Sequence, residues 1–355
     1  MIRWNNDYNH TAHPAVLQAL AECSQEGFDG YGQDRWCREA ADRIRQLLGP
    51  DGRDADVQFL SGGTQSNLTV ITAALRPVES VICAASGHIH AHETGSIEAT
   101  GHKVLALLSE DGKIDPALLA RELARFYDDP AQEHLTIPKL VYLSFPSEFG
   151  TLYSRTELEE IHGLCRKYGL YLFLDGARLG YGLTAPSNDV TLADIARLTD
   201  VFYLGGTKCG AMIGEAVVLL NRQLQRDFRF YMKQRGAVLA KGWLMGLQFA
   251  VLLRGGMPGT KEEPLYFSET RRAAEYAMTL RDAFHTKGIP FFVESPTNQQ
   301  FVVLSDAQLQ ALENAGHLVE YMDRTDETHR CVRFCTSWST RPEDMEKLLA
   351  DIAQL

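Results

Sequence analysis

The stretch "DVQFLSGGTQSNLTVITAALR", residues 56–76, decides the fold class of this chain. Residues 56–60 are predicted to form a strand, residues 61–67 a glycine-rich turn and residues 68–76 a helix. Strand-like and helix-like patterns keep alternating from about residue 57 to 220. This alternation predicts an α/β protein whose sheet is largely parallel.

Outward from this stretch, four more strands are predicted at residues 80–86, 139–145, 170–174 and 200–204. An amphipathic helix is expected over residues 155–169, with Thr156 as its cap and Gly169 at its end. A long helix at 236–254 is expected to join a large domain, 1–254, to a small α+β domain, 255–355. The small domain is predicted to hold helices 268–287 and 342–354 and strands near 290–294, 299–304 and 330–336.

The charge, the apolar runs and the cysteines of the chain argue against some classes of protein. The formal net charge is 35 − 46 = −11, which argues against a nucleic-acid partner, because phosphate contacts need a basic face. The apolar run "WLMGLQFAVLL" contains Gln248 and is shorter than the roughly 20 residues that span a bilayer, so no membrane partner is expected. The seven cysteines form no C-x-x-C pair, and together with an N-terminus unlike a signal peptide they favour a cytoplasmic protein.

Three of the predicted strand ends carry side chains suited to chemistry. The turn after residue 60 presents Gly63 and Thr64 at the start of a helix, where backbone N–H groups suit a phosphate, although a plain strand–helix turn explains the glycines equally well. Asp175 closes a second strand, and Lys208 follows a third. Ligands in open α/β sheets bind beyond the carboxyl ends of the strands. We therefore expect these residues to meet in one crevice.

This combination matches what a protein offers to pyridoxal 5′-phosphate (PLP). The cofactor needs a phosphate cradle, an acidic partner for its pyridine nitrogen and a lysine that forms an imine. Each residue alone has a structural explanation, such as an ion pair between Asp175 and Arg178. The three together favour a PLP enzyme.

The chain also resembles a known family. The segments "YGQD", "FLSGGTQSNLT", "HIHAHETGSIEATGHK", "LFLDGARLG", "GGTKCGAMIGEAVV" and "CVRFCTSW" follow one another as in the low-specificity L-threonine aldolases, which are fold-type-I PLP enzymes close to the beta-eliminating lyases. The resemblance implies cleavage of the Cα–Cβ bond of L-threonine, L-allo-threonine or a related β-hydroxy-α-amino acid to glycine and an aldehyde. The nearest alternative within PLP chemistry is β-elimination, which releases ammonia and a keto acid.

The resemblance also implies roles for single residues. Lys208 matches the imine lysine, Asp175 the partner of the pyridine nitrogen, and His88 the histidine that stacks on the ring and lies near the substrate hydroxyl. Thr207, like Gly63 and Thr64, is expected at the phosphate. Arg333, assisted by Arg178 and Asn6, is expected to bind the substrate carboxylate.

Two positions depart from the family pattern. Glu148 stands where some members have a second histidine, which leaves open whether it shares proton transfer with His88. Ala240 replaces an arginine that some relatives use for the phosphate, so Lys241 is a candidate substitute. Tyr31 lies in a segment that reaches the neighbouring subunit's site in this family, which implies a homodimer or homotetramer with active sites at the interface.

Two rival interpretations start from other motifs. His88, His90 and His92 alternate before Glu93 and could begin the site of a metal-dependent hydrolase, but the later strand ends supply no further histidine. "GYGLTA", residues 180–185, matches a dinucleotide fingerprint, yet it does not follow a strand directly. We expect neither a metal nor a dinucleotide.

Overall fold

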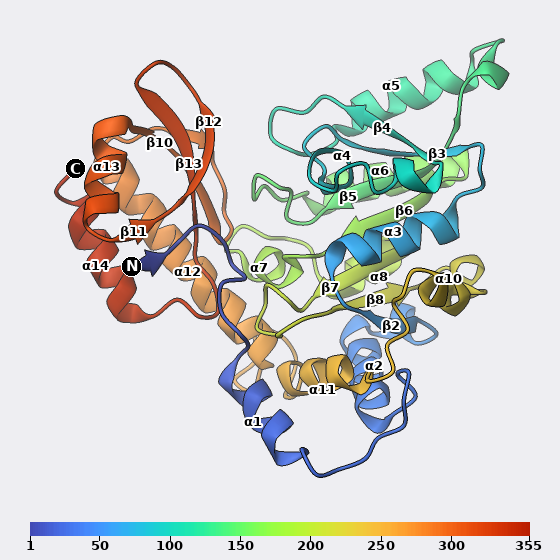
Figure 1. The fold of residues 1–355 in the computed structure, drawn as a ribbon. Helices are drawn as coiled ribbons and strands as arrows, with labels where there is room; N and C mark the ends of the chain where they lie inside the picture. The colour runs from blue at the N-terminus through green and yellow to red at the C-terminus, as the bar shows by residue number, and fades with distance from the viewer.

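The computed structural model describes residues 1–355 and places a large sheet at its centre (Figure 1). Five neighbouring strands of this sheet run parallel, and β8 is antiparallel to both of its neighbours, β7 and β2. In spatial order the seven strands are β2 (Asp56–Leu60), β8 (Glu215–Leu219), β7 (Val201–Gly205), β6 (Tyr171–Asp175), β5 (Ile137–Ser144), β3 (Glu79–Ala84) and β4 (Lys103–Leu107). The predicted α/β class with a largely parallel sheet is therefore confirmed.

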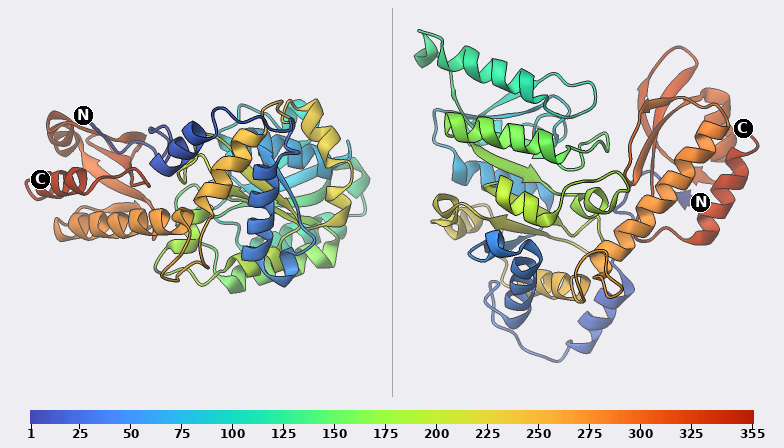
Figure 2. Two further views of the ribbon diagram at one scale, coloured as in Figure 1. Left: turned by 90° about the horizontal axis from the view of Figure 1, so that it is seen from below. Right: turned by 180° about the vertical axis from the view of Figure 1, so that it is seen from behind.

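Helices cover both faces of the sheet because the central strands are apolar on both sides. In β6, Leu172 and Leu174 contribute to one hydrophobic core and Phe173 contributes to the other. Successive residues of a strand point to opposite faces, so such a strand needs a cover on each side. Figures 1 and 2 show α3 and α10 on one face and α5 and α6 on the other.

The large body contains eleven α-helices, of which α1 and α2 precede the strands of the large sheet. They are α1 (Pro14–Glu22), α2 (Arg35–Leu48), α3 (Gly63–Ala74), α4 (His88–Ala91), α5 (Pro116–Tyr127), α6 (Arg155–Tyr168), α7 (Leu179–Thr184), α8 (Leu192–Leu198), α9 (Arg222–Gln225), α10 (Phe228–Gln234) and α11 (Trp243–Leu252). No helix is long and apolar enough to cross a membrane.

Three local predictions were wrong. Helix α3 begins at Gly63 rather than at residue 68. The polar residues after Gly62 fit into a helix because a hydroxyl can donate to the carbonyl four residues earlier, as the Ser66 hydroxyl does to Gly62. Helix α6 is capped by Ser154, not Thr156, through a capping box with Glu157.

The third wrong prediction is a single long helix over residues 236–254. Within that range only α11, Trp243–Leu252, is helical. The preceding helix, α10, ends at Gln234, and Gly236, with a φ of +71°, follows its end. The element that joins the two bodies is α12 (Leu265–Thr286). Its Phe267 lies in the core of the large body and its Phe284 in the core of the smaller one. Figure 2 shows this helix running from one body to the other.

The smaller body packs helices against an antiparallel sheet. Its sheet has the order β12 (Glu320–Arg324), β13 (His329–Cys335), β10 (Gln299–Ser305) and β9 (Phe291–Val293), and its other helices are α13 (Asp306–Asn314) and α14 (Pro342–Ile352). A separate parallel pair joins β1 (Ile2–Arg3) to β11 (His317–Leu318). A boundary at residue 255 stays a prediction. The predicted division assigned residues 1–254 to the large domain, whereas the pairing of β1 with β11 puts the N-terminus in the smaller body.

Candidate active site

Ends of several strands meet at one edge of the large sheet and enclose a cavity of about 320 Å³. The register of the strands aligns their ends. Ser144 at the end of β5 pairs with Asp175 at the end of β6. Glu215 at the start of β8 pairs with Leu60 at the end of β2 and with Gly205 at the end of β7. The predicted residues that line the cavity are Gly63, Thr64, His88, Glu148, Asp175, Arg178, Thr207 and Lys208.

The N-terminus of α3 opens onto this cavity. Gly62 is its N-cap in extended backbone, and no side chain caps the helix there. A Cβ on Gly63 would lie 3.2 Å from the Tyr203 hydroxyl, which leaves little room for a side chain. Uncapped N–H groups and the positive end of a helix dipole form a binding place for an anion such as a phosphate.

Lys208 follows β7 and lines the cavity. The structure gives its ammonium no hydrogen bond and no ion pair, although its backbone carbonyl accepts a bond of 2.7 Å from Tyr181. Burial, together with the Arg178 guanidinium, lowers the pKa of Lys208 below its usual value. A lysine in such surroundings loses its proton more easily and becomes a better nucleophile.

Asp175 is held rigidly at the end of β6. One carboxylate oxygen accepts the backbone N–H of Ala177 at 2.9 Å, and the other accepts from Asn67 at 3.1 Å and from the Tyr142 hydroxyl. Asp175 is only 5% exposed. A buried carboxylate with fixed donors is prepared to hold a proton on a ligand's basic nitrogen.

His88 and Glu148 form the side of the cavity nearest β3 and β5. The backbone N–H of His88 donates to Glu148 Oε1 at 2.8 Å, and Ser144 donates to the same oxygen at 2.7 Å. Glu148 Oε2 is buried without a partner. Burial, with a further contribution from the negative charge of Asp175, raises the pKa of Glu148.

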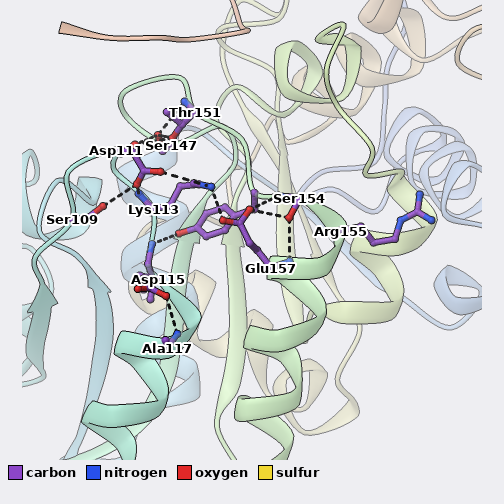
Figure 3. A network of polar contacts seen from close by, with 12 residues as sticks. Ser109, Asp111, Lys113, Asp115, Ala117, Ser147, Thr151, Ser154, Arg155 and Glu157 are labelled. Carbon is purple, nitrogen blue, oxygen red and sulfur yellow. Dashed lines mark hydrogen bonds and ion pairs between the residues drawn. The ribbon is translucent and has the colours of Figure 1, made fainter.

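A polar network fixes the loop that carries Glu148 (Figure 3). The Thr151 hydroxyl donates to the carbonyl of Asp111 at 2.7 Å and lies 2.6 Å from the Ser147 hydroxyl. Nearby, Lys113 Nζ pairs with Glu157 Oε1 at 2.6 Å, which ties the segment after β4 to α6. Glu148 is therefore presented by an anchored loop.

Arg178 lines the cavity, but its guanidinium is already paired. Its Nε and Nη2 contact the two carboxylate oxygens of Asp7 at 2.7 and 3.0 Å, and Asn298 donates to the same carboxylate at 2.9 Å. Burial opposes the charge on Asp7, yet the Arg178 and Lys208 cations outweigh it and lower its pKa to about 2. Of the three guanidinium nitrogens, only Nη1 is not bonded to Asp7. The expected help of Arg178 in binding a substrate carboxylate is therefore limited to this nitrogen.

Four predicted residues lie outside the cavity lining. Arg333, on β13, donates to Gln299 and to the carbonyl of Asn5, each at 3.2 Å, and its Nε is buried without a partner. Asn6 accepts the N–H of Tyr8, which does line the cavity.

The other two are exposed and close to each other. Tyr31 is 52% exposed, and its N–H donates to the carbonyl of Ala240, the neighbour of the exposed Lys241. Both lie on the surface of the chain, away from the cavity lining.

The structure adds polar residues that sequence reasoning missed. Glu215 is 4% exposed and accepts the N–H of Gly206 at 2.9 Å, and burial raises its pKa to about 8. The signal available in the sequence was a carboxylate at the start of the apolar run "EAVVL". Asn67, which lines the cavity, and Glu93, which contacts His88, are also buried.

The motifs behind the rival interpretations have other structural roles. His88 starts the short helix α4, so residues two apart no longer share a face, and His90 and His92 are exposed. No group of three or more side chains in the chain is arranged to hold a metal ion. The "GYGLTA" segment lies within and directly after α7 rather than at a strand–helix turn.

Comparison with known proteins gives concordant matches. A sequence profile of the beta-eliminating lyase family matches residues 8–322. The low specificity L-threonine aldolase of Pseudomonas aeruginosa is 30% identical over 347 residues, which cover 96% of this chain and 93% of that protein.

Solved structures agree. Leishmania major threonine aldolase is 42% identical, with a TM-score of 0.94 and coverage of 100% of this chain and 99% of that one. A serine palmitoyltransferase from S. paucimobilis, solved with PLP and myriocin bound, shares the fold alone, at 17% identity, a TM-score of 0.68 and coverage of 99% and 86%. The fold is that of the fold-type-I PLP-dependent enzymes, as predicted, and the chain belongs to the beta-eliminating lyase family, within it to the threonine aldolases.

Proposed function

We propose that this chain is a PLP-dependent aldolase that cleaves the Cα–Cβ bond of L-threonine, L-allo-threonine or a related β-hydroxy-α-amino acid, yielding glycine and an aldehyde. One observation carries the proposal: an uncapped helix N-terminus, the unpaired ammonium of Lys208 and the rigid carboxylate of Asp175 line a single cavity beside His88. The names of the Pseudomonas aeruginosa and Leishmania major relatives support the substrate class.

The residues present fit PLP. The N–H groups at Gly63 and Thr64, with the Thr207 hydroxyl close by, would hold the phosphate. Asp175 would hold the pyridine nitrogen, and the Lys208 amine would bind the aldehyde carbon. Bound in this way, PLP supplies an electron-accepting ring that stabilises negative charge at the substrate Cα.

The chain's own groups then handle the substrate and its protons. Arg333, whose Nε has no partner, is proposed to bind the substrate carboxylate, with Asn6 beside it. His88 is proposed to take the proton of the β-hydroxyl, after which the Cα–Cβ bond breaks and the aldehyde leaves. The Lys208 ammonium is proposed to return a proton to Cα, which completes glycine.

Glu148 is the second candidate for proton transfer on this side. Its raised pKa and its unpaired Oε2 suit a carboxylic acid that exchanges a proton with a neighbouring hydroxyl. Because its other oxygen is occupied by Ser144 and by the backbone of His88, Oε2 is the atom that is free to act.

We also propose that the chain works as a homodimer or homotetramer with sites at the interface. Tyr31 and Lys241 support this, since both are exposed, their segments are hydrogen-bonded to each other, and neither lines the cavity of its own chain. Mixing Lys208→Ala chains with Tyr31→Ala chains tests it. Recovery of activity in the mixture supports shared sites, whereas two variants that stay inactive when mixed argue against them.

β-Elimination is the second candidate, because the matching profile is that of the beta-eliminating lyases. Product analysis decides between the two. Purified protein with added PLP is given L-threonine, L-allo-threonine and phenylserine in turn. We expect glycine and an equal amount of aldehyde. Ammonia with a keto acid would establish elimination instead.

Lys208→Ala provides the matching control for the cofactor. We expect it to abolish turnover and to prevent borohydride from trapping PLP on the protein, because the amine that binds the aldehyde carbon is gone. Full activity in this variant would contradict the mechanism.

A further inference from the structure

A chain of hydrogen bonds runs along the wall of the cavity from His88 through the buried Glu93 and Asn67 to Asp175. His88 Nδ1 lies 2.8 Å from Glu93 Oε1, and Asn67 Nδ2 donates to that same oxygen at 2.8 Å. Asn67 Nδ2 also donates to Asp175 Oδ2 at 3.1 Å. The side chain of Glu93 is fully buried, as is Asn67.

The carboxylate of Glu93 is held on both of its oxygens. Oε1 faces His88 and Asn67, and Oε2 accepts from the Ser96 hydroxyl at 2.7 Å. A carboxylate only accepts hydrogen bonds, so the nitrogen of His88 that faces it must carry the proton. The other ring nitrogen, Nε2, is then the one available to the cavity.

We propose that Glu93 is a positioning residue that keeps the His88 proton on Nδ1 and leaves Nε2 bare for the reacting group, and that Asn67 couples this pair to Asp175. The proposal rests on the function proposed above, since it assigns how His88 becomes a base. A carboxylate behind an imidazole fixes its tautomer and its orientation and stabilises the imidazolium that forms after proton transfer.

Asn67 suits its place because a single neutral amide nitrogen donates to two carboxylates. Glu93 and Asp175 would otherwise face each other across a buried space with like charges. The amide therefore links the residue proposed to take the β-hydroxyl proton with the residue proposed to hold the pyridine nitrogen. One buried side chain thus contacts both Asp175 and the carboxylate that faces His88.

The charges around His88 agree with this arrangement. Burial opposes the imidazolium, but the hydrogen bond to Glu93 and the negative charge of Asp175 outweigh it and raise the pKa of His88. Lys208 acts in the opposite sense. The remaining groups nearby are His92, whose ring centroid is 5.7 Å away, and Glu148, which accepts the backbone N–H of His88.

Glu93→Gln tests the proposal because it keeps the shape and removes the charge. The pKa of His88 is measured by NMR on isotope-labelled histidine in the cofactor-loaded protein without substrate, with the signal assigned by its loss in His88→Asn. We expect the pKa to fall by roughly one unit, since an opposite charge in contact is lost. An unchanged His88 pKa would overturn the proposal.

Kinetics give the second readout. In Glu93→Gln, kcat for β-hydroxy amino acid cleavage should fall on the order of 100-fold, because a glutamine amide can donate to Nδ1 and move the proton to Nε2. The acid limb of the kcat/KM profile should move to lower pH with the His88 pKa. Glu93→Asp, which restores the charge at a shorter reach, should recover part of both effects. A kcat equal to that of the unaltered protein would also overturn the proposal.

Ser96→Ala is the matched control. It removes a hydrogen bond from the same carboxylate but at Oε2, the oxygen that does not face His88. The His88 pKa should change little in this variant. A shift as large as that of Glu93→Gln would contradict a specific role for the charge at Oε1. If His88 behaves as expected but no substrate is cleaved, the positioning role stands and the proposed aldolase function fails.

Discussion

At the scale of single residues, Asp7 and Arg178 form a buried ion pair beside the cavity. The side chain of Asp7 is fully buried and that of Arg178 is 12% exposed. Asp7→Asn leaves the Arg178 cation without its counter-charge. We expect the free energy of unfolding to fall by about 3–5 kcal/mol, because a buried charge is then uncompensated. Thermal unfolding at neutral pH measures the loss.

The pH dependence of this effect has a definite sign. The folded-state pKa of Asp7, about 2, lies below its ordinary value of 3.8. Its contribution to stability is therefore complete above about pH 4 and is lost as the pH falls through 2. The difference between the two proteins should shrink over that window. Asp42→Asn, which breaks an exposed pair with Arg45, is the control and should cost less than about 1 kcal/mol. Equal losses in both variants would contradict the assignment.

Part of the cavity lining was predicted from its place at the ends of strands, whereas His88, Glu148 and Arg178 were predicted from the family resemblance. Lys208 and Asp175 come just after apolar runs, and the parallel arrangement of those strands brings them together. Glu93 and Asn67 could not be found in this way. Their roles depend on contacts across the fold, between α3, the segment after α4 and β6, which no local pattern reports.

At the scale of elements, the loop after β5 joins the cavity to the smaller body. The carbonyl of Gly150, two residues after Glu148, accepts hydrogen bonds from Ser295 at 3.1 Å and from Thr297 at 3.2 Å. Gly150 has a φ of +74°, and an added Cβ would collide with the Ser295 hydroxyl. This glycine is required by both its backbone and its neighbours.

Gly150→Ala should therefore disturb the loop that presents Glu148. We expect a loss of about 1–3 kcal/mol in the free energy of unfolding, from overpacking and from the strained backbone. The kcat should fall roughly tenfold or more, because displaced groups at a site cost rate steeply. Calorimetry and steady-state kinetics on the cofactor-loaded protein measure the two effects.

Gly163→Ala is the control for this prediction. Gly163 lies within α6, is exposed, and has no atom near the place of an added Cβ. Alanine should raise stability there by up to about 1 kcal/mol, since it favours the helix more than glycine does. If Gly150→Ala behaves like Gly163→Ala, the loop is not held as the structure indicates.

The elements themselves were predictable where their pattern is local. Strand β6 and helix α12 were recognised from their apolar runs and periodicity. The predicted helix 236–254 failed because α11 is buried on nearly every side, so its continuous apolar sequence carried no periodicity to mark where it starts. For the cap of α6, the decisive pattern is the spacing of a capping box, in which Ser154 is followed three residues later by Glu157. The prediction of Thr156 did not take this spacing into account.

At the scale of the whole molecule, the first eight residues connect the two bodies. β1 pairs with β11, and Trp4 is 1% exposed in the core of the smaller body. Three residues later Asp7 is bound to Arg178, and Tyr8 lines the cavity. The sequence assigned this segment to the large domain because a parallel contact with residues more than 300 positions away leaves no local trace.

Trp4 should therefore matter for both stability and cofactor binding. Trp4→Ala removes a buried indole whose Nε1 donates to His317 at 3.1 Å, and we expect a loss of about 3–5 kcal/mol in the free energy of unfolding. PLP affinity, measured by fluorescence titration, should also fall, because the segment that carries Asp7 and Tyr8 loses its anchor. Phe230→Ala, at an aromatic residue that is 74% exposed, is the control. Stability lost without any change in PLP affinity would mean that the cavity is organised independently of the N-terminal strand.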